Sequence, residues 1–385
     1  MKRAALTFRG FYSSKFVLLG IQLPFFSGWL ALRGFSAPEI GWITGFALCA
    51  RLIFGPFVAI WADQQADDRR ALRIVALIFA LSAVGLCLEL GKVQIWICAS
   101  SVLWAFGMLV PLIDNAALKA DRAGHLHYGQ TRAVGSFSFV ATTLIGGALL
   151  AQFGLDWSVA IMAMAAVATF LFSLGLPSYP NEQNASAQMW RDAPALMTDP
   201  RFILLILAAG FTQGSHAVYY AFSILHWTDL GYSTRLIGFL WTVGVLAEIM
   251  LLTRARSLAK RLSPAVMIGI GGLAATIRWP LTAMEPAIGL LIVIQLLHAF
   301  TFAAAFLGGI EFIDRAIPTR LTNTAMTLMS VTGVGALTGI ATVVSGYIFS
   351  SAGINIAYFA MSGMGVMSVV LSFALARRWR GEKIL

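Results

Sequence analysis

The stretch Gly231–Glu248, GYSTRLIGFLWTVGVLAE, decides the fold because the chain carries a second version of it. An offset of 197 residues places it on Gly34–Arg51, GFSAPEIGWITGFALCAR, without a gap over 18 residues. Each version reads as a short loop followed by a long apolar helix. Each helix carries one ionisable residue at the same place, Arg51 in the first and Glu248 in the second. An offset near half of the 385 residues predicts two related halves in tandem, a pattern typical of transporters with a site near the middle of the bilayer.

The composition is that of a multi-pass membrane protein. Hydrophobic residues make up 59% of the chain and charged residues 11%, whereas soluble domains carry about 25% charged residues. The three cysteines all lie in apolar stretches, and their spacing predicts neither a disulfide framework nor a metal site. No phosphate-binding G-x-x-x-x-G-K-[ST] loop occurs, which argues against direct use of ATP. We expect no cofactor and no metal.

Apolar runs of about 20 residues predict twelve membrane-spanning helices. Six are expected at 11–32, 38–61, 71–90, 93–117, 130–152 and 156–176, and six at 201–228, 235–254, 264–282, 287–311, 321–349 and 353–376. The polar stretch between them, 177–200, is rich in Pro, Asn and Ala and predicts a linker. The predicted division is therefore a six-helix bundle over 1–176, a cytoplasmic linker over 177–200 and a second six-helix bundle over 201–385.

The basic residues predict the orientation, because cytoplasmic loops of membrane proteins are enriched in Lys and Arg. With the N-terminus in the cytoplasm, the inside segments hold 21 of the 27 Lys and Arg. Both termini are then cytoplasmic in an inner-membrane protein. The net charge of +10 follows from this topology and suits contact with anionic lipid, not with nucleic acid.

Several motifs resemble those of known carriers. Gly55–Asp63 followed by Arg69 and Arg70 resembles the loop motif of the major facilitator superfamily, although Ala59, Gln64 and Ala66 depart from it. A second set resembles the phenylpropionate permease family, which is related to the lactose permease and nucleoside symporter branches. The motifs that carry this second resemblance are QGSHAVYYAFSILHW at Gln213–Trp227, the stretch Gly231–Glu248, Ile277–Trp279, IQLLH at Ile294–His298, PLID at Pro111–Asp114 and YGQTRAVGS at Tyr128–Ser136.

The resemblance implies the twelve-helix major facilitator fold, a monomer, and proton-coupled symport of an aromatic acid. It implies cavity-lining roles for His216, Tyr219 and His298. The sequence departs from the lactose branch three residues after His298, where Thr301 stands in place of a carboxylate. The proton route of that branch therefore cannot be transferred intact.

Ionisable residues inside spans are costly and need a partner or water. Glu248 and Arg278 could form a structural ion pair, or Glu248 could carry the proton under the influence of Arg278. Asp114 and Arg132 are expected at matching depths in the membrane. They could form a coupling pair, or they could be solvated residues at the interface. Lys15, one turn into the first span, is expected to extend to the inner surface. Arg51 and Arg278 are the arginines well inside spans, and a guanidinium suits a carboxylate.

We therefore predict a secondary transporter, and not an enzyme, that carries a small aromatic organic acid with protons. A nucleoside or sugar symporter and an exporter of the same superfamily are the alternatives. An enzyme or a membrane sensor is disfavoured by dispersed charges and by the short linker. The residues predicted to bind substrate are Arg51, Arg278, His216, Tyr219, Tyr220, Gln213 and Trp241. Those predicted to couple protons are Glu248, His298, Asp114 and Arg132, and those of the conformational loop motif are Asp63, Arg69 and Arg70.

Overall fold

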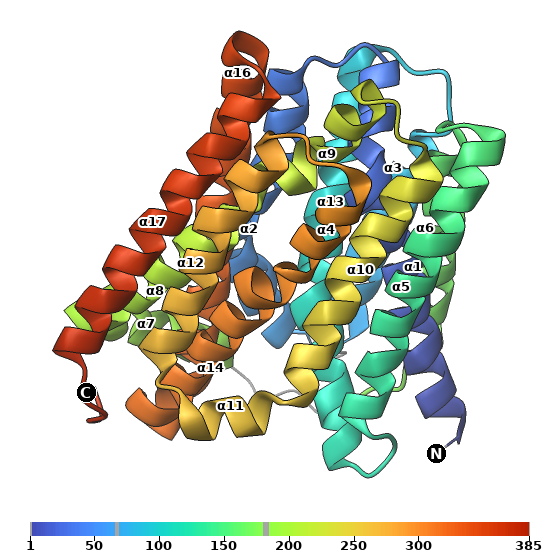
Figure 1. Cartoon of the computed structure of the whole chain (residues 1–385). Helices are drawn as coiled ribbons and strands as arrows, with labels where there is room; N and C mark the ends of the chain where they lie inside the picture. Colours follow the sequence, from blue (N-terminus) through green and yellow to red (C-terminus); the bar gives the residue numbers. More distant parts are fainter. Residues whose placement is uncertain (1, 66–68, 180–184, 385) are drawn as a thin grey trace. The chain divides into compact units, whose positions relative to one another are not determined.

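A computed structural model describes the chain except residues 1, 66–68, 180–184 and 385 (Figure 1). The described residues form helices joined by short connections, with no strand among them. The first half contains α1 Lys2–Leu32, α2 Ala37–Asp63, α3 Arg69–Gly85, α4 Lys92–Arg122, α5 Tyr128–Phe153 and α6 Trp157–Leu174. The second half contains α7 Ala185–Met197, α8 Pro200–Gly214, α9 Ala217–Asp229, α10 Thr234–Thr253, α11 Ala255–Arg261, α12 Pro264–Ala283, α13 Ile288–Leu296, α14 Ala305–Ala316, α15 Thr322–Leu328, α16 Leu337–Ala352 and α17 Ile354–Arg378.

Three predicted spans are interrupted within the second half. The span predicted at 201–228 divides into α8 and α9 at Ser215–His216. A π-helical stretch, Ala299–Ala304, joins α13 to α14, and another, Met329–Ala336, joins α15 to α16. Such wide turns are uncommon and often occur at functional sites. The predicted linker contains the short helix α7, and its residues 180–184 lie outside the described part of the chain.

Eleven helical runs in the described part of the chain are long and apolar enough to cross a membrane. The remaining predicted span corresponds to α3, which has 17 residues. At 1.5 Å per residue this helix is about 26 Å long, slightly shorter than the hydrocarbon core of about 30 Å. It begins two residues before the predicted start and ends five residues before the predicted end.

The sequence repeat corresponds to a repeat of backbone geometry. Gly34 and Gly231 have φ angles of +80° and +81°. After Gly34, the amide of Phe35 donates to the carbonyl of Leu30, and after Gly231 the amide of Tyr232 donates to that of Trp227. Both are Schellman turns, in which a left-handed residue, usually glycine, ends the helix. The sequence therefore repeats at this point because the same helix ending has to be built twice.

A second pair of turns extends the repeat to the other end of each half. Gly154, after α5, has φ +91°, and Gly353, after α16, has φ +90°. Their amides donate to Leu150 and Phe349 respectively, four residues earlier in each case. Few side chains match around these two glycines, so the repeat here is visible in the backbone and not in the sequence.

The chain forms two compact units. Unit 1 contains Met1–Ser36, Phe46–Ser186 and Phe222–Phe239, and unit 2 contains Ala37–Gly45, Ala187–Ala221 and Leu240–Leu385. Within unit 1, α1 packs against α5 and α6, and α3 packs against α4 and α6. Within unit 2, α12 packs against α14 and α17, and α8 packs against α17. The predicted division at 176 and 201 stays a prediction.

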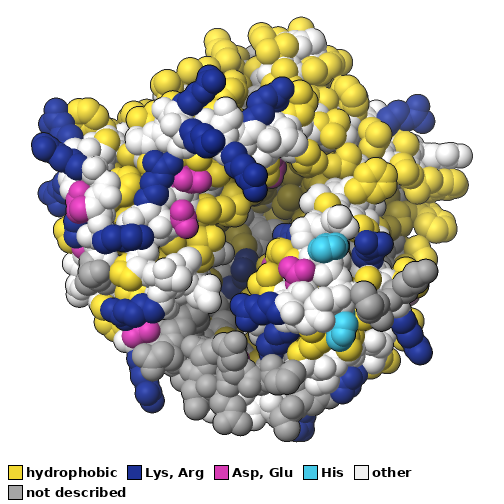
Figure 2. Space-filling view, turned by 90° about the horizontal axis from the view of Figure 1, so that it is seen from below, with side chains coloured by type: hydrophobic (Ala, Val, Ile, Leu, Met, Phe, Trp, Pro, Cys, Tyr) yellow, Lys and Arg dark blue, Asp and Glu magenta, His cyan; other side chains and the backbone are white. Residues whose placement is uncertain are grey.

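In each unit the predicted cytoplasmic segments meet at one end. In unit 1 the guanidinium groups of Arg69 and Arg73 donate to carbonyls at the end of α6, and His125 contacts Tyr179. Figure 2 views the molecule from below and shows a face on which Lys and Arg side chains are numerous. Clustering of basic side chains at one end is typical of the cytoplasmic side of membrane proteins.

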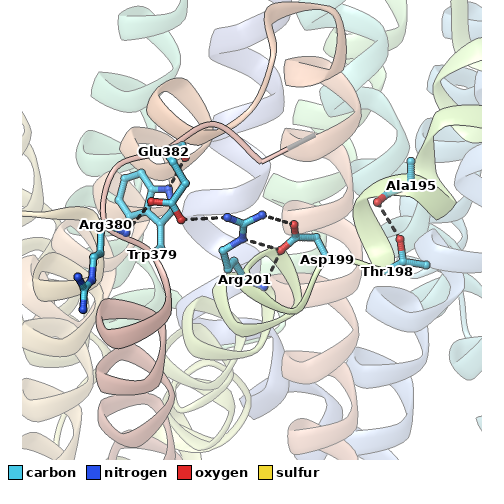
Figure 3. Close-up of polar contacts among 7 residues, drawn as sticks. All are labelled: Ala195, Thr198, Asp199, Arg201, Trp379, Arg380 and Glu382. Carbon is cyan, nitrogen blue, oxygen red and sulfur yellow. Dashed lines mark hydrogen bonds and ion pairs between the residues drawn. The ribbon is translucent and has the colours of Figure 1, made fainter.

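In unit 2 this end is closed by the C-terminal segment Trp379–Ile384. The Trp379 ring lies 4.7 Å from that of Phe312, and Ile384 is fully buried in the same apolar cluster as α7 and α8. Asp199 begins α8 by accepting a hydrogen bond from the amide of Arg201, and Pro200 takes the first helical position. The Arg201 side chain connects Asp199 to Glu382, at 2.7 and 2.9 Å (Figure 3).

Candidate functional site

The interior of unit 2 holds a fully buried arginine, Arg278 of α12. Its Nη2 donates to Gln295 Oε1 at 2.9 Å, and its Nη1 donates to His298 Nδ1 and to Thr301 Oγ1, both at 3.1 Å. Gln295 lies near the end of α13, and Thr301 lies in the π-helical stretch that follows. The guanidinium is thus held by three uncharged acceptors on one segment, and none of these acceptors is a carboxylate.

These contacts determine the tautomers of two histidines. Arginine donates and cannot accept, so His298 Nδ1 is the acceptor and the neutral ring carries its proton on Nε2. That nitrogen lies 3.5 Å from Glu248 Oε2. His216 Nδ1 lies 3.1 Å from the carbonyl of Gln213, so this ring carries its proton on Nδ1 instead. The two histidines therefore have opposite tautomers.

Thr301 connects the two histidines. Its oxygen accepts from Arg278, and its hydroxyl proton is directed to His216 Nε2 at 3.0 Å, because that nitrogen is an acceptor. The side chain of Gln213 is held by its own donation to the carbonyl of Phe302 at 3.1 Å. One continuous chain of polar contacts therefore runs from Gln213 through His216, Thr301, Arg278 and His298 to Glu248.

Glu248 reaches His298 because α10 comes close to α13 at Gly244. A Cβ atom at Gly244 would lie 3.3 Å from His298 Cβ and 3.5 Å from the carbonyl of Gln295. Glu248 follows one turn later on the same face of α10. Of the two alternatives that the sequence left open, the direct ion pair of Glu248 with Arg278 does not form among the described residues, since His298 lies between them in the chain of polar contacts.

Aromatic rings cover the polar chain. The guanidinium carbon of Arg278 lies 4.8 Å from the centre of the Tyr219 ring and 4.5 Å from that of Trp279. Trp241 stacks on Tyr219 with centroids 4.4 Å apart, and Tyr220 stacks on His216 at 5.2 Å. Rings on the faces of a guanidinium stabilise it when water is excluded.

Three buried donors of this site have no acceptor among the described residues: Arg278 Nε, Gln295 Nε2 and Trp241 Nε1. Buried donors are normally paired, and leaving one unpaired costs about 1–3 kcal/mol. Unpaired donors on α10, α12 and α13 suit a ligand that brings acceptor atoms.

In unit 1, the side chains of Asp114 and Arg132 lie next to each other. Arg132 Nε is 3.7 Å from Asp114 Oδ1, and the same oxygen accepts from the hydroxyl of Tyr12 at 2.5 Å. The Arg132 guanidinium also lies 4.8 Å from the centre of the Phe16 ring. This pair joins α4 and α5 to α1.

Two further cations lie inside unit 1. Lys15 is 1% exposed, with Nζ 4.2 Å from the centre of the Phe106 ring, so the expectation that it extends to the surface is wrong. Arg51 of α2 lies against Gly107 of α4, where a Cβ atom would overlap Arg51 Cδ. Arg51 belongs to unit 1, and the Arg278 site belongs to unit 2.

The loop motif lies where α2 ends and α3 begins. Asp63 is the last residue of α2, and Arg69 and Arg70 open α3. Arg69 donates to the carbonyl of Leu176 at 3.1 Å, and Arg70 to Gln65 Oε1 at 3.3 Å. Ala66, one of the departures from the motif, lies outside the described residues.

Sequence reasoning did not assign roles to Gln295 and Thr301. Both are polar residues in an otherwise apolar span, and both lie three residues from His298. That spacing places them near one face of a helix. This spacing is the sequence feature that could have indicated a role for both residues. Their role as acceptors for the Arg278 guanidinium is visible only in the structure.

The helices, the tandem halves and the buried polar chain define a multi-pass membrane protein of the transporter class. The family model described as the MFS_1 like family matches residues 6–360, and the chain belongs to that family of the major facilitator superfamily. The "Probable 3-phenylpropionic acid transporter" of Escherichia coli (strain K12) is 29% identical over 347 residues, covering 89% of this chain and 90% of the relative. The "Maltose permease" of Geobacillus stearothermophilus is 25% identical, covering 96% and 94%.

Solved structures agree on the fold. The nucleoside transporter NupG matches with a TM-score of 0.75 at 19% identity, covering 98% of this chain and 100% of that one. The POT family transporter PepTSo matches with a TM-score of 0.78 at 11% identity, covering 98% of each chain. The predicted major facilitator fold and the resemblance to the phenylpropionate carriers are confirmed.

Proposed function

We propose that the protein is a proton-coupled symporter that carries a small aromatic organic acid, of the 3-phenylpropionate type, across the inner membrane. It acts as a monomer by alternating access, with both termini in the cytoplasm. The observation that carries the proposal is the chain of polar contacts Glu248–His298–Arg278, covered by aromatic rings in unit 2. The "Probable 3-phenylpropionic acid transporter" among the relatives supports the same substrate class.

The proton is assigned to Glu248. His298 cannot accept a proton on Nδ1 while Arg278 donates to that nitrogen, so a proton reaching the pair is held by the carboxylate. Movement of Arg278 toward an incoming anion would release Nδ1 and let His298 accept the proton instead. Protonation and substrate binding are then linked through one side chain. Asp114 and Arg132 are proposed as a second coupling pair in unit 1.

The aromatic part of the substrate is assigned to Tyr219, Tyr220 and Trp241, with His216 and Gln213 holding the polar chain behind them. Rings favour stacked or edge-on contacts with an aryl group, worth about 0.5–1.5 kcal/mol each beyond burial. Arg51 and Arg278 are the candidate cations for the carboxylate. Both Nη atoms of Arg278 already donate to the protein, which makes Arg51 the more available of the two.

Coupling to protons has an electrical reason. Moving a monoanion into a cell with a negative interior costs about 2.3 kcal/mol per 100 mV. One proton carried with the substrate cancels that charge, and a second makes uptake electrogenic. The motif Asp63, Arg69 and Arg70, at the α2–α3 connection, is proposed to act in the change of conformation.

The test is uptake into proteoliposomes under an imposed pH gradient, with labelled 3-phenylpropionate, a nucleoside and maltose as the panel. We expect accumulation of the acid alone, abolished by a protonophore. Accumulation of the nucleoside or the sugar instead would replace the substrate assignment. If the pH gradient drives labelled 3-phenylpropionate only out of the proteoliposomes, the protein would be identified as an exporter.

A further inference from the structure

The charges inside unit 1 do not balance. Among the described residues, the cations Lys15 of α1, Arg51 of α2 and Arg132 of α5 lie within its helices, and Lys15 is 1% exposed. Asp114 is already engaged by Arg132 and by the hydroxyl of Tyr12. Among the described residues, no carboxylate forms an ion pair with Lys15 or Arg51, so their positive charges lack a partner within the bundle. A buried charge without a partner is costly, so such a pair needs an anion.

The two cations meet neighbouring positions of α4. Lys15 Nζ lies over the ring of Phe106, and Arg51 Cδ and Nε lie over Gly107. The missing side chain at Gly107 is what admits the arginine, because a Cβ atom there would be 2.8 Å from Nε. The Nε atom of Arg51 is buried and has no hydrogen-bond partner among the described residues.

The same face of α4 carries two more unsatisfied polar groups. Trp104 and Ser100 lie one and two turns before Gly107, and their Nε1 and Oγ atoms are buried without a partner among the described residues. Ser100 is 5% exposed. Together with the two cations, this face offers hydrogen-bond donors and positive charge, the combination that recognises a carboxylate.

We propose that Lys15 and Arg51 form an anion subsite in unit 1 that binds the carboxylate of the transported acid. The inference rests on the proposed function for the identity of the acid, but not for the presence of an anion. The Phe106 and Phe16 rings hold Lys15 in place, at 4.2 and 5.2 Å from Nζ.

The first experiment measures binding of 3-phenylpropionate and of its neutral amide to the full-length protein in nanodiscs of zwitterionic lipid. These discs exclude anionic headgroups as the bound anion. Removing one charge from a hydrogen-bonded buried pair typically weakens binding by about 30-fold or more. We expect that loss for the acid in Lys15→Met and in Arg51→Gln, with little change for the amide. Arg33→Gln, which removes an exposed cation of unit 1, is the matched control and should leave both affinities unchanged.

A second readout separates ligand binding from a structural role. Without ligand, Lys15→Met should unfold at the same or a higher temperature than wild type, because an unpaired buried charge has been removed. A lowered unfolding temperature together with unchanged affinity for the acid would assign Lys15 to the fold and overturn the subsite.

Failure of the substrate assignment can be distinguished from failure of the subsite. If wild type binds no aromatic acid, the proposed function falls, and the subsite is then tested with sodium acetate, benzoate and phosphate by thermal unfolding. Stabilisation of wild type that is lost in Lys15→Met and Arg51→Gln would retain the anion subsite without the aryl acid. Equal responses of wild type and both variants to all three salts would overturn it.

Discussion

The Nη1 atom of Arg278 lies 3.1 Å from Nδ1 of His298, and this contact fixes the histidine proton on the side that faces Glu248. An arginine can therefore act on a carboxylate without touching it, through the tautomer of the histidine between them. The arrangement differs from an ion pair, in which the carboxylate and the guanidinium would neutralise each other directly. It leaves Glu248 as the group that gains or loses a proton.

The first prediction concerns Glu248→Gln. The amide oxygen can still accept from His298 Nε2, so we expect stability to change by no more than about 1 kcal/mol, the net worth of a single neutral hydrogen bond. Exchange of labelled 3-phenylpropionate across proteoliposomes should continue, while accumulation driven by a pH gradient is lost. Glu89→Gln, at an exposed position, is the control and should accumulate like wild type. Accumulation retained in Glu248→Gln would exclude Glu248 as the proton carrier.

The second prediction concerns Thr301, which stands where the lactose branch has a carboxylate. Thr301→Val removes one of the two acceptors of Arg278 Nη1, which leaves one N–H of that atom unpaired, and it removes the donor to His216 Nε2. Leaving two buried groups unpaired should lower the free energy of unfolding by about 2–6 kcal/mol, at about 1–3 kcal/mol each. Thr301→Ser keeps the hydroxyl and should cost less than about 1.5 kcal/mol. Thermal unfolding in detergent compares the two, and equal stabilities would show that the hydroxyl is not part of the chain.

The fold and most of the residues around Arg278 could be predicted from the sequence, but the hydrogen bonds that join these residues could not. The repeat at Gly34 and Gly231 was readable because a Schellman turn favours glycine at the left-handed position. The basic segments were readable because topology depends on simple counts of charge. These signals are local in the chain, and they were enough to predict helices and their order.

The hydrogen-bond partners of the site residues depend on three-dimensional contacts that cannot be derived from composition. Lys15 near a helix end is equally consistent with extension to the surface and with burial, and only the ring of Phe106 decides between them. The sequence left open a direct ion pair of Glu248 with Arg278, because they are opposite charges on neighbouring helices. Gly244 and the π-helical stretch instead place His298 between them. The acceptor geometry around one guanidinium cannot be read from spacing alone.

The third prediction uses a glycine of the repeated stretch. Gly238 lies within unit 1 against α5, where a Cβ atom would be 2.5 Å from the carbonyl of Thr143. Backbone cannot give way easily, so Gly238→Ala should destabilise the protein by about 1–3 kcal/mol. Gly363→Ala, at a helical position with nothing within 4 Å, is the control and should be neutral or slightly stabilising. Similar thermal unfolding of both variants would show that the close approach at Gly238 is not required.

The last prediction concerns the C-terminal segment and pH. Hydrogen bonds from the Arg201 side chain hold the pKa of Asp199 below its usual range, and backbone amides of Glu382 and Arg380 do the same for the pKa of Glu382. A carboxylate with a lowered pKa stabilises the folded state above its ordinary pKa, about 3.9 for Asp and about 4.3 for Glu. That stabilisation is lost as pH falls through the lower, folded-state value. The segment should therefore loosen in acid, from about pH 4 downward.

Arg201→Gln removes the side chain that joins Asp199 to Glu382, while Lys383, which donates to carbonyls of Asp314 and Ile317, keeps its own contacts. Exposed ion pairs contribute little to stability, so at neutral pH the variant should unfold only slightly below wild type. As the pH falls from about 5 to about 3, the difference should shrink, because wild type loses the interaction that the variant already lacks. Arg380→Gln, whose backbone amide still reaches Glu382, is the control and should follow wild type across the range.

Limited proteolysis after Trp379 provides an independent measurement. Cleavage that rises in acid for wild type and is already raised at neutral pH in Arg201→Gln would support the bridge from Asp199 to Glu382. A constant gap between the two proteins at every pH would mean that Arg201 does not hold the segment through these carboxylates.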